Sequence, residues 1–117
     1  MTNAAKQKGS SFERLIVNYL NEMEFDCERT RAGWTDDRGD IHGVRSAQGL
    51  PFTFECKNQR RIDLAGWTKE LVTEVRNAKG EIGAVVHKRI GTGDAQDQYA
   101  SLPFWMLVQL LKEAGYR

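Results

Sequence analysis

The chain has 117 residues, which suits a single domain (1–117) with its own core and is too short for two. Hydrophobic residues make up 40% and charged residues 28%, as in soluble globular proteins, and no apolar run approaches the roughly 20 residues that span a bilayer. The formal net charge of +1 leaves the class of partner open. No apolar signal segment opens the chain, so we expect an intracellular, cytoplasmic protein without a membrane partner.

Residues 1–8 are polar and are expected to form a flexible arm. From Phe12 to Met23 the apolar residues recur at helical spacing, which predicts an amphipathic helix. Ser10 is a natural N-cap, and Glu13 three residues later completes the S-x-x-E capping box. Glu13 therefore has a structural role open to it besides any role in a site.

Three antiparallel strands are predicted next, at 25–31, 40–45 and 51–57, joined by short connections. The loop before the second strand contains Trp34, which either stacks on a base or anchors the loop. In the third strand Glu55 and Lys57 point to one face because side chains alternate. Ordinary solvated charges on a half-exposed strand are the alternative interpretation. Cys27 and Cys56 lack CxxC spacing, so we expect buried free thiols.

Asp63 is predicted to cap a second helix that stops at Gly80. The uniform apolar run 82–86 indicates a buried strand, parallel to its neighbour because a helix leads to it. A short edge strand at 98–102 and a last helix opened by Pro103 complete the chain. The order α-β-β-β-α-β, with a further strand and a C-terminal helix, predicts an α/β fold around a mixed central sheet.

Three acids stand at the positions where a site is expected. If the second and third strands pair, Asp40 and Glu55 share a face, and Glu13 projects from the first helix. Carboxylates on rigid elements suit Mg²⁺, with Mn²⁺ as a substitute. Lys57 is a mobile point charge that can reach an adjacent substrate oxygen.

Glu13, Gly39-Asp40 and Glu55-Cys56-Lys57 resemble the E…(G)D…ExK pattern of the PD-(D/E)XK nuclease superfamily. Segments 8–14 and 54–57 are similar to its Holliday-junction resolvase branch, and the resemblance covers roughly residues 8–90. It implies a restriction-endonuclease-like core, a catalytic lysine at Lys57 and a polar site position at Gln59. It also implies metal ligands at Glu13, Asp40 and Glu55. Gly39 stands where the superfamily often has proline.

The implied function is a Mg²⁺-dependent endonuclease that cuts phosphodiesters of branched DNA, preferably four-way junctions. The alternatives are a nuclease of the same superfamily for flaps, ends or restriction sites, and a DNA-binding module without catalysis. His42 and His87 are more often structural than catalytic at strand ends, and Lys88 and Arg89 could equally be a solvated surface pair. The expected DNA contacts are Lys8, Arg60, Arg61, Lys88, Arg89 and Trp34.

The last helix is apolar nearly all round. One side can cover the sheet and the other needs a partner, so we expect a homodimer, whose two-fold symmetry would match paired cuts in a junction. A helix buried deep in the core is the alternative.

Overall fold

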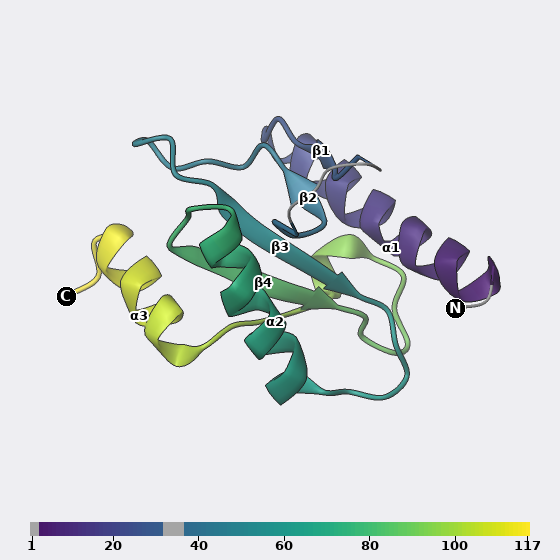
Figure 1. The fold of residues 1–117 in the computed structure, drawn as a ribbon. Coiled ribbons are helices and arrows are strands. Elements are labelled where there is room, and N and C mark those ends of the chain that lie inside the picture. Colours follow the sequence, from purple (N-terminus) through teal and green to yellow (C-terminus); the bar gives the residue numbers. More distant parts are fainter. Residues whose placement is uncertain (1–2, 32–36) are drawn as a thin grey trace.

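The computed structural model describes residues 3–31 and 37–117, and within them it has three α-helices and a five-stranded mixed sheet (Figure 1). The strand order across the sheet follows the chain. Only β3 and β4 are parallel, and the other neighbouring strands in this sheet are antiparallel. The predicted α/β class, the parallel strand after the second helix and the edge strand are confirmed. The strands are β1 (Glu28–Arg29), β2 (Ile41–His42), β3 (Phe52–Lys57), β4 (Ile82–His87) and β5 (Tyr99–Ser101).

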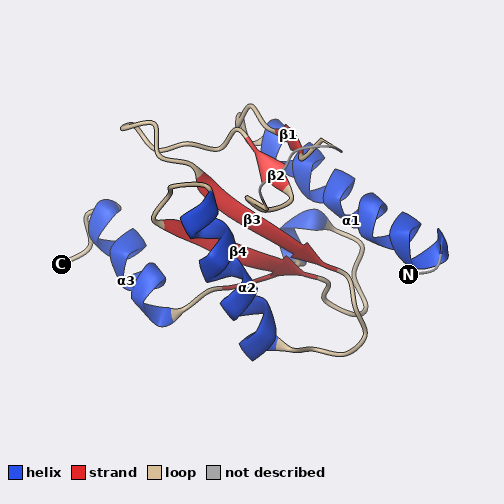
Figure 2. Ribbon diagram, in the orientation of Figure 1, coloured by secondary structure: helices blue, strands red, loops and turns tan. Residues whose placement is uncertain are grey.

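The sheet is covered by a helix on each face (Figure 2). α1 (Asn3–Glu22) packs on one face, α2 (Leu64–Asn77) packs on the other, and α3 (Phe104–Glu113) lies beyond one end of β4 (Figure 1). Two clusters of buried side chains result. Each large apolar side chain that is buried in them stabilises the fold by roughly 1.5–3 kcal/mol. The α1 cluster contains Phe12, Ile16, Val17, Cys27, Ile41 and Phe54, and the α2 cluster contains Trp67, Leu71, Val75, Ile82, Val85 and Met106.

The first helix is longer than predicted. It begins at Asn3, so residues 3–8 of the arm that we expect to be flexible are helical. Ser10 consequently lies inside the helix and cannot cap it, which removes the capping box. Both of its side chains bind Arg29 instead: Ser10 Oγ accepts from Arg29 Nη2 at 3.1 Å and Glu13 Oε1 accepts from Arg29 Nε at 3.1 Å. An arginine on β1 thus ties the helix to the sheet.

The first two strands are shorter than predicted, because a side chain replaces a strand partner before β1 and a glycine with positive φ follows β2. Before β1, the Asn21 side chain pairs with both backbone groups of Cys27, at 3.0 and 3.1 Å, in place of a neighbouring strand. After β2, Gly43 has a φ of +116°, and a Cβ there would collide with the carbonyl oxygen of Asp26. Cys27 is a buried free thiol as expected, whereas Cys56 is a free thiol that is only half-buried.

The second helix begins as predicted, because Asp63 Oδ1 accepts a hydrogen bond from the Gly66 N–H at 3.0 Å. Its predicted apolar stripe is buried at Trp67, Leu71 and Val75. Glu74 is buried on the same side, with 3% of its surface exposed. The helix therefore turns a carboxyl group toward the sheet.

The last helix rests on the α2 cluster through few side chains. Met106 is fully buried and Leu110 packs beside it. The alternative in which this helix is buried deep in the core is therefore wrong, because most of its apolar side chains are exposed. These are Phe104, Trp105, Leu107, Val108 and Leu111. Among the residues described, no helix combines the length and the apolar character needed to cross a membrane.

Candidate metal centre

The carboxyl end of β3 carries the predicted Glu55 and Lys57 on the face that α2 covers. Glu55 is 7% exposed, and Lys57 Nζ lies 3.5 Å from Glu55 Oε1 and 3.1 Å from Oε2 of Glu70 on α2. Burial alone would lower the pKa of Lys57, but the hydrogen bond to Glu70 and the charge of Glu55 raise it. Lys57 is therefore a fixed positive charge beside a buried carboxylate.

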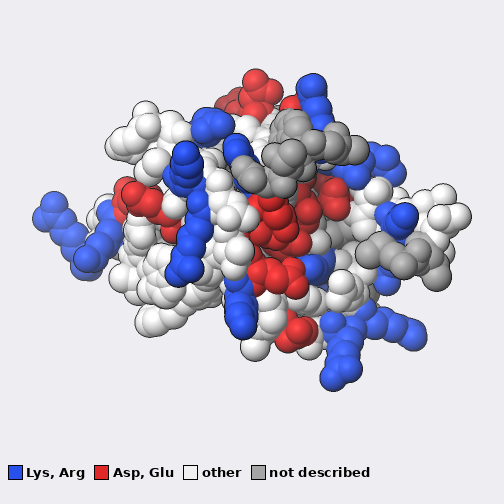
Figure 3. Space-filling model, in the orientation of Figure 1, with Lys and Arg blue, Asp and Glu red and all other residues white. Residues whose placement is uncertain are grey.

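A group of three carboxylates surrounds Glu55. Oxygen atoms of Asp37, Glu55 and Glu74 all lie within 4.8 Å of one another, and this group could hold a metal ion. Glu55 and Glu74 are both more than nine-tenths buried, and Oε2 of each has no hydrogen-bond donor in the described part of the chain. Asp and Glu side chains gather near the middle of the face that carries α2 (Figure 3). We call Asp37, Glu55 and Glu74 the carboxylate cluster.

The carboxylate cluster cannot hold three unshared negative charges. At 4.8 Å and an effective dielectric constant of about 20, two unit charges repel by roughly 3.5 kcal/mol. Burial raises the pKa of Glu74 to about 11, and the neighbouring Glu55 and Asp37 carboxyl groups add to the shift. Because carboxylates are acceptors only, Glu74 can bond to them only by carrying a proton. Either that proton or a cation must sit between these oxygens, and hard oxygen ligands select Mg²⁺, Mn²⁺ or Ca²⁺.

Asp40 lies against β3 just beyond the point where β2 pairs with it. Its Oδ2 accepts a hydrogen bond from the Cys56 N–H at 2.7 Å, and its own N–H donates to the Phe54 carbonyl at 2.7 Å. Burial raises the pKa of Asp40 to about 7, the charges of Glu55 and Glu13 add to the shift, and the Cys56 hydrogen bond opposes it. Asp40 and Glu55 are therefore electrostatically coupled neighbours.

Gly39 is required by the close approach of its loop to β3. Its φ is +94°, which proline cannot adopt, and a Cβ there would lie 2.6 Å from the Phe54 carbonyl oxygen. The glycine lets the loop come close enough for Asp40 to accept a hydrogen bond from the backbone of β3. Gly39 therefore fixes the place of the Asp40 carboxylate.

Glu13 approaches from the opposite face of the sheet. Its helix packs on the α1 cluster, beside which Cys56 is partly buried, whereas Glu55 faces α2. Its carboxylate forms a partly exposed ion pair with Arg29. Glu13 still contributes negative charge to the surroundings of Asp40.

The residues expected to bind DNA lie at several places around this centre. Lys8 is exposed on α1, and Arg60 and Arg61 are exposed in the loop between β3 and α2. Gln59, which the resemblance implies as a polar site position, is exposed in the same loop. Lys88 follows β4, and its ammonium group donates to the Thr92 carbonyl. Arg89 is exposed beside Tyr99, and Trp34 lies outside the described residues.

Sequence reasoning missed two members of the carboxylate cluster. We interpret Asp37 from sequence only as a turn residue. Glu74 carries a signal, since it stands three residues after Leu71 and seven after Trp67, on the side of α2 that packs against the sheet. A charged residue in a buried stripe calls for a partner of its own.

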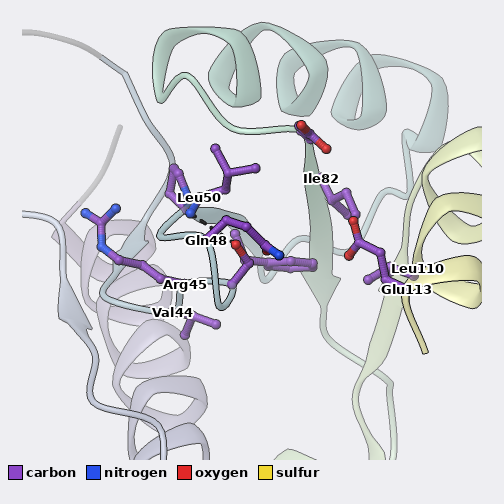
Figure 4. Close-up of a pocket in the computed structure, with 11 residues that line it drawn as sticks. Val44, Arg45, Gln48, Leu50, Ile82, Leu110 and Glu113 are labelled. Carbon is purple, nitrogen blue, oxygen red and sulfur yellow. Dashed lines mark hydrogen bonds between the residues drawn. The ribbon is translucent and has the colours of Figure 1, made fainter. Parts of the chain in front are cut away.

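A small apolar pocket of about 190 Å³ lies away from this centre (Figure 4). Its walls include Leu110 of α3 and the first residues of β3 and β4, which are Phe52 and Ile82. Phe52 stands three positions before Glu55, about 10 Å along the strand, and the pocket lining includes no member of the carboxylate cluster, so the two are separate features.

Searches of protein-family models and of curated proteins return no match for this chain.

Proposed function

We propose that this protein is a divalent-metal-dependent endonuclease that acts on branched DNA, with four-way junctions as the preferred substrate. The observation that carries the proposal is the buried Glu55, which belongs to the carboxylate cluster with Glu74 and Asp37. Among the described residues its Oε2 has no hydrogen-bond partner, and Lys57 Nζ lies 3.5 Å from its Oε1. A cation site directly beside a fixed ammonium group suits the charge of a phosphodiester under attack.

The sequence supports the same function. The Gly39-Asp40 and Glu55-Cys56-Lys57 segments resemble the PD-(D/E)XK nucleases, and the order of helices and strands is compatible with the core of that superfamily. The neighbouring positions of Asp40 and Glu55 agree with the roles that the resemblance implies.

In this proposal Asp40 and Glu55 are ligands of Mg²⁺, with Mn²⁺ as a substitute, and Glu74 and Asp37 extend the ligand set on the α2 side. The cation would supply Lewis-acid stabilisation of charge at the scissile phosphate and make water more acidic. Lys57 would place its charge on a phosphate oxygen, with Glu70 fixing its direction. Glu13 is left out of the ligand set because Arg29 binds its carboxylate.

DNA would approach over the exposed basic residues near the carboxyl end of β3. Arg60 and Arg61 follow the site directly, and Arg89 follows β4, the strand next to β3. We propose that these three, with Lys8, bind backbone phosphates.

The exposed side of α3 would join two copies. Phe104, Trp105 and Leu107 are 76%, 55% and 38% exposed, although large apolar side chains gathered on one helix are costly in water. A two-fold interface through α3 would place two equivalent sites on one junction.

A panel of DNA substrates tests the proposed function. The protein is incubated in Mg²⁺ with a four-way junction, a flap and a linear duplex of matched arm sequence, and the products are separated under denaturing conditions. The proposal predicts junction cutting well above that of the other two. Equal cutting of all three would remove the preference for junctions. Binding in Ca²⁺ without cutting at any Mg²⁺ or Mn²⁺ concentration would identify a DNA-binding module instead.

A further inference from the structure

A row of three side chains leads across the sheet from the candidate site to its edge. Lys57 of β3 pairs with His87 of β4, and His87 pairs with Tyr99 of β5. Directly opposite residues of neighbouring strands project to the same face, so all three side chains lie on the α2 side. Two spacings of about 4.8 Å separate the backbones of Lys57 and Tyr99, roughly 10 Å in all.

The Tyr99 ring is supported by His87, the middle residue of the row. His87, 5% exposed, is in ring contact with Trp67 at 5.4 Å and with Tyr99 at 5.6 Å, and its Nε2 lies 2.8 Å from Ser101 Oγ. These contacts fix the imidazole, and the imidazole supports the inner side of the Tyr99 ring. His87 is thus structural in this row.

The outer part of Tyr99 is open. Tyr99 is 51% exposed on β5, the edge strand of the sheet. The Arg89 guanidinium lies 5.8 Å from the centre of its ring, within cation–π range, and the Arg89 N–H is fixed by Gln98 Oε1 at 2.8 Å. The guanidinium lies over the half-exposed ring, and when it turns to a phosphate the ring offers a stacking surface.

We infer that Tyr99 is a stacking platform for an unpaired nucleobase of the DNA strand whose phosphate lies at Lys57. The inference rests on the proposed nuclease function and names the feature of DNA that the site selects. Roughly 10 Å corresponds to about three nucleotides of a stacked strand. Paired bases in a duplex are already stacked, whereas bases at a branch or in a single-stranded segment are available to an edge ring. Arg89 would bind the phosphate of the stacked nucleotide.

The test compares two DNAs with the full-length chain in Ca²⁺, by fluorescence anisotropy. One DNA is a fully paired duplex, and the other has three unpaired nucleotides beside the same duplex. Tyr99→Ala should weaken binding to the unpaired DNA by about tenfold and change binding to the duplex by less than about twofold. Tyr99→Phe should bind both like the wild type because the aromatic face is kept.

Two further variants separate stacking from packing. Tyr99→Leu keeps apolar bulk over His87 without the aromatic face and should show the same selective loss as Tyr99→Ala. Tyr116→Ala removes an exposed tyrosine, 71% exposed near the C-terminus, and should leave both affinities unchanged. An equal loss for both DNAs, or full binding by Tyr99→Leu, overturns the inference.

The same samples, transferred to Mg²⁺, keep the two proposals apart. A wild-type protein that cuts junctions while Tyr99→Ala binds unpaired DNA normally would overturn only the stacking platform. Selective binding that depends on Tyr99 without any cleavage by the wild type would overturn only the nuclease.

Discussion

The Asp40 carboxylate accepts the Cys56 N–H at 2.7 Å. This bond occupies a position where β3 has no strand partner on its β2 side, because the β2–β3 ladder pairs only Ile41 with Phe54. The side chain therefore satisfies a backbone N–H of β3 and at the same time stands beside Glu55. A carboxylate fixed in this way needs no cation to hold it in place, as expected for a preorganised site.

Asp40→Asn should separate this structural role from the chemistry. The amide oxygen can still accept the Cys56 bond, so we expect a folded protein, while loss of the charged ligand should lower the cleavage rate at least about 100-fold, equivalent to roughly 2.7 kcal/mol. DNA binding in Ca²⁺ should be unchanged or tighter because a negative charge near phosphate is removed. Single-turnover cleavage and anisotropy measure the two effects. A variant that cuts at the wild-type rate would exclude Asp40 from the site.

Glu13→Gln should reduce cleavage much less than Asp40→Asn does. Glu13 and Arg29 form a partly exposed ion pair, so the free energy of unfolding should fall by less than about 1 kcal/mol. Parallel cleavage assays and thermal melts check this, with Glu28→Gln as the matched control, since Glu28 pairs with Arg31 on the surface. Complete loss of cleavage in Glu13→Gln would instead place Glu13 among the metal ligands.

The metal-free protein should lose stability as the pH rises from about 5 to about 8. The pKa of Asp40 is raised from 3.8 to about 7, and that of Glu74 is raised as well. Over this range these two carboxyl groups therefore bind more protons in the folded protein than in the unfolded chain, which makes unfolding easier as the pH increases. Burial lowers the pKa of His42 and His87, and these groups oppose the trend at the lower end of the range. Thermal melts in EDTA measure the trend. Mg²⁺ or Mn²⁺ should restore stability most at the upper end of this pH range, where the cation takes the place of the protons on these carboxyl groups.

Glu74→Gln is the control for that prediction. The amide can donate to Glu55 as a protonated carboxyl would, but it does not titrate. We expect a flatter dependence of melting temperature on pH and a smaller stabilisation by Mn²⁺. If both stay as in the wild type, Glu74 neither holds the proton nor binds the cation.

Trp105→Glu should convert a dimer into monomers. Trp105 is 55% exposed on α3, so the substitution tests the surface without opening the core, and Tyr116→Glu, also exposed, is the control. Sedimentation at micromolar concentration gives the mass, and junction cleavage separates single nicks from paired cuts. A wild-type monomer of 13.3 kDa that still makes paired cuts would refute the dimer.

Much of the fold follows from local patterns in the chain. The apolar run at β4 and the Asp63 cap give their elements directly, because each depends on neighbours in sequence. The start of α1 does not follow, since Ser10 binds Arg29 on a strand that is distant in sequence. Tertiary contacts of this kind override a capping pattern.

The candidate site is only half visible in the sequence. Asp40, Glu55 and Lys57 follow from strand alternation and a short motif. Glu74 needs the packing of α2 against β3, which sets a helical carboxyl group opposite a strand carboxylate. The role of Gly39 likewise cannot be predicted from the sequence, because it depends on how closely its loop approaches the Phe54 carbonyl.

Cleavage of a four-way junction by the wild type and by Glu55→Gln, with Mg²⁺ and with EDTA, tests the central claim most directly. Glu55 belongs to the carboxylate cluster and contacts Lys57, so its charge is required for both the cation and the lysine. We predict cutting by the wild type in Mg²⁺ alone, and none by Glu55→Gln although it remains folded and binds the junction. Cleavage by the wild type in EDTA, or cleavage by Glu55→Gln at the wild-type rate, would contradict the account.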